Sequence, residues 1–153
     1  MILEYYSMPH AKHKPVRANP SDAGLDLKYN PDVGSQPVSI EPGQSMILGT
    51  GLKFGVPHGY MIQIMNRSGN AAKKKLMVGA CVVDSGYNGE VFVNLHNIGS
   101  KPQTINPGDK IAQAVVIPVV PVRFLETSND NLYEWAPITI SDRGAGALGS
   151  TGR

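Results

Sequence analysis

Cysteine is nearly absent from this chain, which contains a single one, Cys81, among 153 residues. One thiol cannot form an internal disulfide or supply a zinc site of several cysteines. The four histidines are scattered, so the His and Cys spacing of a transition-metal site is missing as well. We therefore expect one domain that is stabilised by its hydrophobic core.

Long apolar stretches and a strong charge of either sign are also missing. No window approaches the roughly 20 apolar residues that span a bilayer, and the first residues lack the regions of a secretory signal. The net charge of +2, from 14 basic and 12 acidic residues, is too small to indicate a nucleic-acid partner. We expect a cytoplasmic protein, in the host cytoplasm if the source is viral, that binds neither membrane nor nucleic acid.

Glycine and proline are abundant, with 17 and 12 residues, and they separate short β-type patterns. This composition predicts an all-β fold, and the turn spacing is typical of a jelly roll or small barrel. One helix of at most two turns is expected over residues 69–75, and its Lys73-Lys74-Lys75 run is expected to face solvent. The expected strands are residues 2–6, 38–40, 45–54, 60–65, 76–83, 90–96, 103–105, 111–118 and 122–125.

Residues 82–91 place a carboxylate and an aromatic ring three residues apart, Asp84 and Tyr87, between two apolar runs. The dipeptide Asn88-Gly89 readily supplies the positive φ angles of a tight turn, which predicts a β-hairpin with Asp84 and Tyr87 near its tip. Asp is also a common turn residue with purely local hydrogen bonds. These residues alone leave both a catalytic and a structural Asp84 open.

Three more segments carry polar groups that suit a phosphate or a cation. Arg67, Ser68 and Gly69 open the expected helix, where free N–H groups attract anions, although Ser68 could simply cap the helix. Gln113 interrupts an apolar run and could bind a ligand or satisfy a core hydrogen bond. Asp26 lies among small and apolar residues, where it could pair with an arginine or organise a hydrated metal ion.

The C-terminal residues 142–152 are rich in glycine and cannot bury a core. They could form a frayed terminus. Alternatively, converging N–H groups, the Arg143 guanidinium and the hydroxyls of Ser150 and Thr151 could fold over a phosphate when ligand is bound. We expect a β-domain over residues 1–141 and a flexible arm over residues 142–153.

Taken in order, these five segments resemble the five motifs of the trimeric dUTPase family, the deoxyuridine triphosphate nucleotidohydrolases. The resemblance implies a jelly-roll-like β-barrel subunit and a homotrimer whose active sites are shared among chains. It also implies Mg²⁺-dependent hydrolysis of dUTP to dUMP and pyrophosphate. The segments that carry the resemblance are residues 23–27, 67–69, 82–89, 108–113 and 143–152.

The resemblance implies a role for each motif. Asp84 would orient and deprotonate the water that attacks the α-phosphorus, and Tyr87 would pack against deoxyribose and exclude a 2′-hydroxyl. Mg²⁺ would be held mainly by the phosphates, with Asp26 contacting it through water, while the arm closes over the γ-phosphate. The implied substrate-binding residues are Arg67, Ser68, Gly69, Cys81, Val83, Tyr87, Phe92, Gln113, Arg143, Leu148, Gly149, Ser150 and Thr151.

Four positions depart from the family pattern. Leu148 stands where an aromatic usually stacks on uracil, which predicts a lid weaker by ~1 kcal/mol. Asn66 replaces a proline, Asn70 replaces a common leucine, and Cys81 replaces a frequent glycine near the backbone that reads uracil. Two alternatives stay open: a dCTP deaminase of the same fold, and a dUTP-gated module that binds a partner protein.

Overall fold

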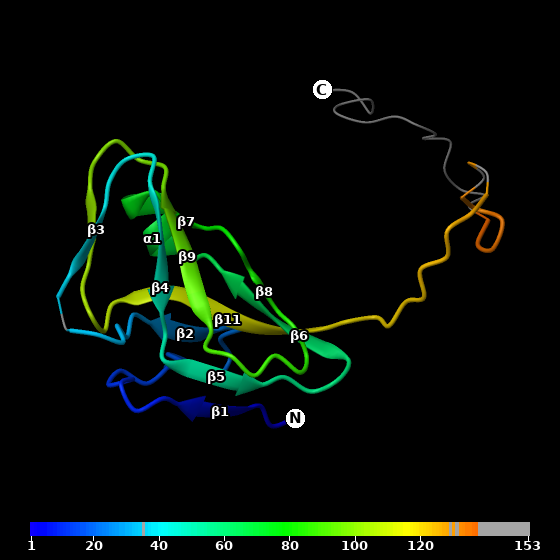
Figure 1. Ribbon diagram of the computed structural model, residues 1–153, viewed down its shortest axis with the longest axis horizontal. Helices are drawn as coiled ribbons and strands as arrows, with labels where there is room; N and C mark the ends of the chain where they lie inside the picture. Colours follow the sequence, from blue (N-terminus) through cyan, green and yellow to red (C-terminus); the bar gives the residue numbers. More distant parts are fainter. Residues whose placement is uncertain (35, 129, 131, 138–153) are drawn as a thin grey trace. The chain divides into compact units, whose positions relative to one another are not determined.

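The computed structural model describes residues 1–34, 36–128, 130 and 132–137. The chain divides into two compact units, Met1–Pro121 and Val122–Arg153. The described residues form eleven strands and one helix, which confirms the expected all-β class (Figure 1). The boundary expected at residues 141 and 142 lies outside the described residues.

The strands of the first unit form four small antiparallel sheets. The largest contains, in spatial order, β2 (Leu25–Lys28), β11 (Lys110–Pro118), β6 (Tyr60–Met65) and β8 (Val82–Val83). The next contains β4 (Ser45–Gly49), β9 (Phe92–Asn97) and β7 (Leu76–Val78). The two remaining pairs are β1 (Glu4–Ser7) with β5 (Leu52–Gly55) and β3 (Val38–Ile40) with β10 (Gln103–Ile105).

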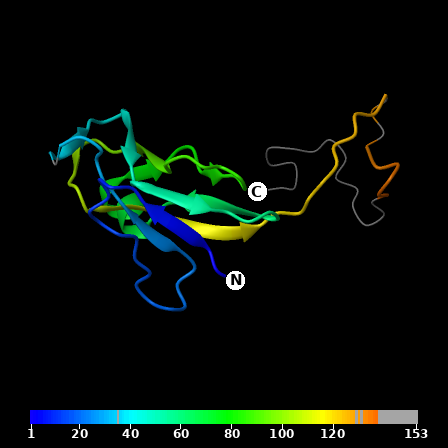
Figure 2. The same cartoon turned by 60° about the horizontal axis from the view of Figure 1, so that its bottom comes forward.

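Alternating side chains give the strands one buried face. In β6, Ile62 and Ile64 are buried. In β9, Val93 and Leu95 are buried, whereas Phe92 points to the other face and is half exposed. These residues belong to one hydrophobic core that draws on all four sheets. Figure 2 shows β1 and β5 side by side at the edge of the unit, where β1 pairs with β5 alone.

Three expected strands, at residues 38–40, 60–65 and 103–105, have the predicted bounds. The single strand expected at 45–54 is wrong, because the chain turns at Thr50 and Gly51 between β4 and β5. Gly51 has a φ of 64°, which glycine adopts at little cost, and the Thr50 hydroxyl donates to the Val91 carbonyl (2.6 Å). The strand expected at 76–83 is also two strands, since β7 pairs with β9 and β8 pairs with β6.

Three further differences concern short elements. β2 is a strand absent from the prediction, although its alternation of leucine with charged residues is a strand signal. Residues 122–125 do not form the expected strand. Helix α1 spans Ser68–Lys74, one residue earlier than expected at each end, because Lys75 takes a left-handed φ of 56° that ends it. This helix is too short to cross a membrane, and the described residues contain no helix long and apolar enough to do so.

Candidate active site

Asp84 and Tyr87 lie in one turn that follows β8. The Tyr87 N–H donates to the Asp84 carbonyl (3.2 Å), and Gly86 has the positive φ, 85°, that a type II turn requires at its third residue. β8 pairs with β6, whereas β9 pairs with β4 and β7. The predicted hairpin with its turn at Asn88-Gly89 is therefore wrong, because the two strands belong to different sheets.

The Tyr87 ring folds back over Gly89. Its hydroxyl donates to the Glu90 carbonyl (2.9 Å), and a Cβ on Gly89 would collide with the ring. Gly89 is not among the glycines with a positive φ. Glycine is thus required at residue 89 by the close approach of the tyrosine ring, and not by the turn geometry that the sequence indicated.

This turn borders a cavity of about 360 Å³. Its walls are mainly apolar, with the half-exposed rings of Tyr87 and Phe92 and two acidic residues, Asp84 and Glu90, in the lining, which is typical of a small-molecule site. Five predicted site residues meet here. The cavity is lined by Ile64, Ala80, Cys81, Val82, Val83, Asp84, Tyr87, Glu90, Val91 and Phe92.

The backbone at Cys81 is held by strand β6. The Cys81 carbonyl accepts a hydrogen bond from the Ile64 N–H (2.7 Å). Only main-chain atoms take part in this bond, so it fixes the cavity wall whichever side chain stands at position 81. Cysteine in place of the family's frequent glycine therefore leaves this backbone contact intact.

A second group of predicted residues gathers around Asp26 on β2. Its Oδ1 accepts from Arg67 Nε and its Oδ2 accepts from Lys110 Nζ, both at 2.8 Å, and the side chain is 15% exposed. Burial raises the pKa of Asp26, but hydrogen bonds from Lys110 and Arg67 and their charges outweigh it, so the pKa lies below its ordinary value of 3.8. Of the two roles left open by the sequence, pairing with arginine is the one formed here.

Gln113 lies on β11 between Asp26 and Met65, its neighbours on the flanking strands. Its Nε2 donates to the Asn66 carbonyl (3.0 Å). Gly24 leaves the space for this side chain, since a Cβ at residue 24 would collide with Gln113. The amide thus satisfies a backbone carbonyl, and its contact with a ligand stays a prediction.

Helix α1 begins without a side-chain cap. The N-cap residue is Arg67, with extended φ and ψ angles, and no side chain bonds to the first turn. The alternative in which Ser68 caps the helix is therefore wrong. The first N–H groups of a helix lack partners within it, so those at Ser68 and Gly69 are free of intrahelical bonds.

Asn66 and Asn70, two departures from the family pattern, brace the backbone on either side of this helix start. The Asn66 Oδ1 accepts from the Val78 N–H (2.7 Å). Asn70 is buried, and its Nδ2 donates to the carbonyls of Lys110 (3.0 Å) and Ile111 (3.2 Å). These bonds attach the segment to β7 and β11 and so fix the position of Arg67.

Within one chain Arg67 and Gly69 border a different cavity from that of Asp84 and Tyr87. The cavity beside Asp84 has no contribution from Arg67, Ser68 or Gln113 to its lining. Arg67 borders a cavity of about 440 Å³, which is lined by Arg67, Gly69, Asn70, Lys73, Lys74, Gly108, Asp109 and Lys110. Lys73, Lys74 and Lys75 are exposed, which confirms the expected solvated face, and the first two also adjoin the predicted phosphate-binding segment.

A family model described as dUTPase matches residues 10–152. The chain belongs to the dUTPase family. A relative from Gloeobacter violaceus, named deoxyuridine 5'-triphosphate nucleotidohydrolase, is 40% identical over 147 residues, covering 95% of this chain and 92% of the relative. A relative of the same name from Dinoroseobacter shibae is 42% identical over 143 residues, covering 91% of this chain and 87% of the relative.

Solved dUTPases share the fold of this dUTPase-family chain. The Staphylococcus bacteriophage 80alpha dUTPase with dUpNHpp superposes with a TM-score of 0.82 over 99% of both chains, at 21% identity. This likeness confirms the expected jelly-roll-like fold. The resemblance inferred from five short motifs is also confirmed, since the family match spans them all.

Not every predicted residue of this dUTPase-family chain can be placed, and two residues of the site were not predicted. The predicted residues of the arm, Arg143, Leu148, Gly149, Ser150 and Thr151, lie outside the described residues. Sequence reasoning missed Lys110 as a partner of Asp26, although it lies within the segment 108–113. It also missed Glu90 as a lining residue, which directly follows the segment 82–89.

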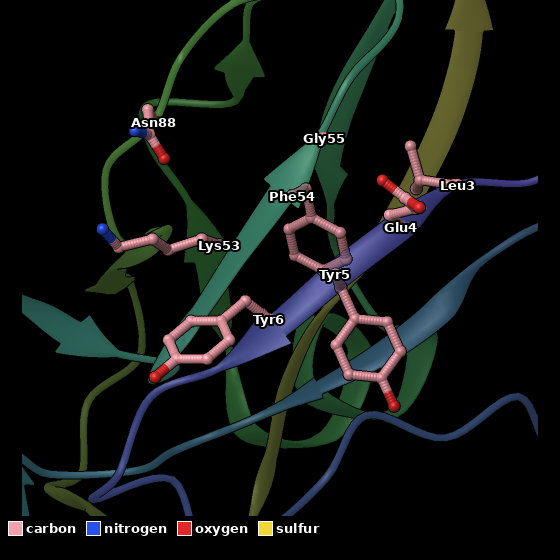
Figure 3. A pocket seen from close by; sticks show the side chains of 8 residues that line it. All are labelled: Leu3, Glu4, Tyr5, Tyr6, Lys53, Phe54, Gly55 and Asn88. Carbon is pink, nitrogen blue, oxygen red and sulfur yellow. The ribbon is translucent and has the colours of Figure 1, made fainter.

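The structure also has a cavity that no motif indicated. It measures about 700 Å³ and lies against β1 and β5, where Tyr5 packs near Phe54 with ring centroids 6.1 Å apart (Figure 3). Of its lining residues, Asn88 alone belongs to the segment of Asp84. None of the predicted substrate-binding residues that the structure describes lines this cavity.

Proposed function

We propose that this chain hydrolyses dUTP to dUMP and pyrophosphate, with water as the nucleophile. The observation that carries the proposal is the meeting of Asp84 and Tyr87 at one cavity of about 360 Å³, a volume within the range of small-molecule sites. The 40% identity to a relative named for this activity supports the same conclusion.

The cavity suits the nucleoside part of the substrate. Val83 and Phe92 supply apolar surface for the base, and backbone groups near Cys81 provide hydrogen bonds to uracil. The Tyr87 ring, fixed by its bond to the Glu90 carbonyl, packs against deoxyribose. At the rim, the Asp84 carboxylate positions a water molecule, accepts its proton as oxygen attacks the α-phosphorus, and pyrophosphate departs.

The triphosphate requires the second group of residues. Arg67 supplies positive charge, the N–H groups at Ser68 and Gly69 donate to phosphate oxygens, and Gln113 contributes from β11. In one chain Arg67 and Gly69 border a different cavity from that of Asp84, which supports a homotrimer whose sites combine segments of different copies. The arm would complete each site through Arg143, Leu148, Gly149, Ser150 and Thr151.

The accompanying ion is Mg²⁺, carried mainly by the substrate phosphates. The described residues contain no group of three or more His, Cys, Asp or Glu side chains that could hold a metal ion. Both oxygens of Asp26 accept from cations, so a water-mediated contact requires one ion pair to open. Asp26, with both oxygens paired, suits a Mg²⁺ that arrives with phosphate ligands of its own.

The test is pyrophosphate release from dUTP with Mg²⁺, comparing the unaltered chain with Asp84→Asn. The variant should lose hydrolysis and still bind a non-hydrolysable dUTP analogue, because Asn keeps the shape but cannot take the proton. Asp32→Asn, at a carboxylate whose side chain is 80% exposed, is the matched control and should retain full activity. Full activity in Asp84→Asn would remove Asp84 from the mechanism, and ammonia release from dCTP would favour a deaminase instead.

A further inference from the structure

Glu90 inserts its carboxylate into a slot formed by the corner between β4 and β5. The Gly51 N–H donates to Glu90 Oε1 at 2.7 Å, and the Glu90 side chain is 12% exposed. A Cβ added at Gly49 would lie 2.8 Å from the same oxygen and 3.2 Å from the Asn30 carbonyl. The slot thus accepts a carboxylate because residue 49 has no side chain.

The His10 ring and the Val91 backbone lie next to this slot. His10 Nε2 lies 3.9 Å from Glu90 Oε1, and His10 Nδ1 lies 3.5 Å from Asp32 Oδ1. Both backbone groups of the following residue, Val91, are hydrogen-bonded. Its N–H donates to the Leu52 carbonyl (2.8 Å), and its carbonyl accepts from the Thr50 hydroxyl (2.6 Å). Glu90 is therefore attached to the β4–β5 corner in two ways, through its own carboxylate and through the backbone of Val91.

The same residue also holds the Tyr87 ring. The Tyr87 hydroxyl donates to the Glu90 carbonyl (2.9 Å), and the Tyr87 side chain is otherwise half exposed. A tyrosine ring rotates about two side-chain bonds, so its place in the cavity depends on the partner of its hydroxyl. That carbonyl is held from two sides, by the Glu90 carboxylate in the Gly49–Gly51 slot and by the Val91 N–H of the same peptide unit, which bonds to the Leu52 carbonyl.

We propose that Glu90 is a positioning residue that fixes the Tyr87 ring and thereby sets the preference for deoxyribose over ribose. The proposal rests on the function proposed above, in which Tyr87 contacts the sugar. Rejection of a 2′-hydroxyl by shape requires a ring that cannot move aside. A Tyr87 ring without a fixed hydrogen-bond partner can move aside for a 2′-hydroxyl. We therefore expect kcat/KM to rise more for UTP than it falls for dUTP.

The test compares kcat and KM for dUTP and UTP in Glu90→Ala, Glu90→Gln and Gly49→Ala. Glu90→Ala should lower the ratio of kcat/KM for dUTP to that for UTP by about tenfold, the effect of one ordinary hydrogen bond. Glu90→Gln keeps an oxygen that accepts from Gly51, so its ratio should stay near that of the unaltered chain. Gly49→Ala displaces the carboxylate without changing Glu90, and should match Glu90→Ala.

The dUTP-to-UTP ratio in the variants decides whether Glu90 positions the Tyr87 ring. An unchanged ratio in Glu90→Ala and Gly49→Ala, with both variants showing cooperative thermal unfolding, would overturn the assignment. If Glu90→Ala does not fold, Gly49→Ala decides alone. Glu41→Ala, at an exposed glutamate, is the control and should keep the ratio. Absence of dUTP hydrolysis by the unaltered chain would instead refute the proposed function, which separates the two failures.

Discussion

The paired cations around Asp26 allow a quantitative prediction for Asp26→Asn. Asn offers one oxygen where Asp offers two, so either Arg67 or Lys110 loses its acceptor and faces an amide N–H₂ group. The side chains are 15% exposed at Asp26, 30% at Arg67 and 35% at Lys110. Such partly buried contacts fall between exposed ion pairs, at about 0.2–1 kcal/mol, and broken buried pairs, at about 3–5 kcal/mol.

We therefore expect Asp26→Asn to lower the free energy of unfolding by about 2 kcal/mol at neutral pH, with a drop in Tm of roughly 4–8 °C for a domain of this size. Urea denaturation followed by circular dichroism at fixed protein concentration measures the change. Asp32→Asn, at an exposed carboxylate, is the matched control and should stay within about 0.5 kcal/mol of the unaltered chain.

The pH dependence gives this prediction its sign. The pKa of Asp26 in the folded chain lies below the ordinary 3.8 that applies when the chain unfolds, so the unfolded state binds more protons as the solution becomes acidic. The stabilisation is complete above 3.8 and is lost as the pH falls through the folded value. The difference in the free energy of unfolding between Asp26→Asn and the unaltered chain should therefore vanish in acid. A gap that stays constant there would refute the electrostatic explanation.

Two further substitutions test the packing around the predicted phosphate-binding segment by the same denaturation assay. Gly24→Ala places a methyl group against Gln113 and should destabilise the fold by about 1–3 kcal/mol; Gly69→Ala, where an added Cβ meets nothing, should not. Asn70→Ala leaves two carbonyls of β11 without their donor and should cost about 1–3 kcal/mol. Unchanged midpoints would contradict the roles given to these contacts.

Much of the candidate site could be predicted because its parts are local in sequence. Asp84 and Tyr87 occupy one four-residue turn, so their spacing alone brings them to the same place. Arg67, Ser68 and Gly69 precede or open one short helix for the same reason. Turn chemistry and apolar patterns also place strands such as β6 with its observed bounds.

Strand pairing could not be predicted in the same way. Residues 82–91 satisfy the local rules for a hairpin, yet β8 pairs with β6 and β9 pairs with β4 and β7. Burial of Val83, Val93 and Leu95 in a common core favours that arrangement, and local propensity contains no information about it. The same limit explains why Gly89 suits the hairpin prediction but serves the Tyr87 ring instead.

The sequence by itself determined the fold class and the family, and it proposed the residues of the candidate site, because composition, turn signals and motif order are properties of neighbouring residues. Only the tertiary structure decided which distant groups meet. Lys110 reaches Asp26 because β11 lies beside β2, and Glu90 enters the Gly49–Gly51 slot because the β4–β5 corner packs there. Such contacts depend on sheet pairing and core packing, which arise from the whole chain at once.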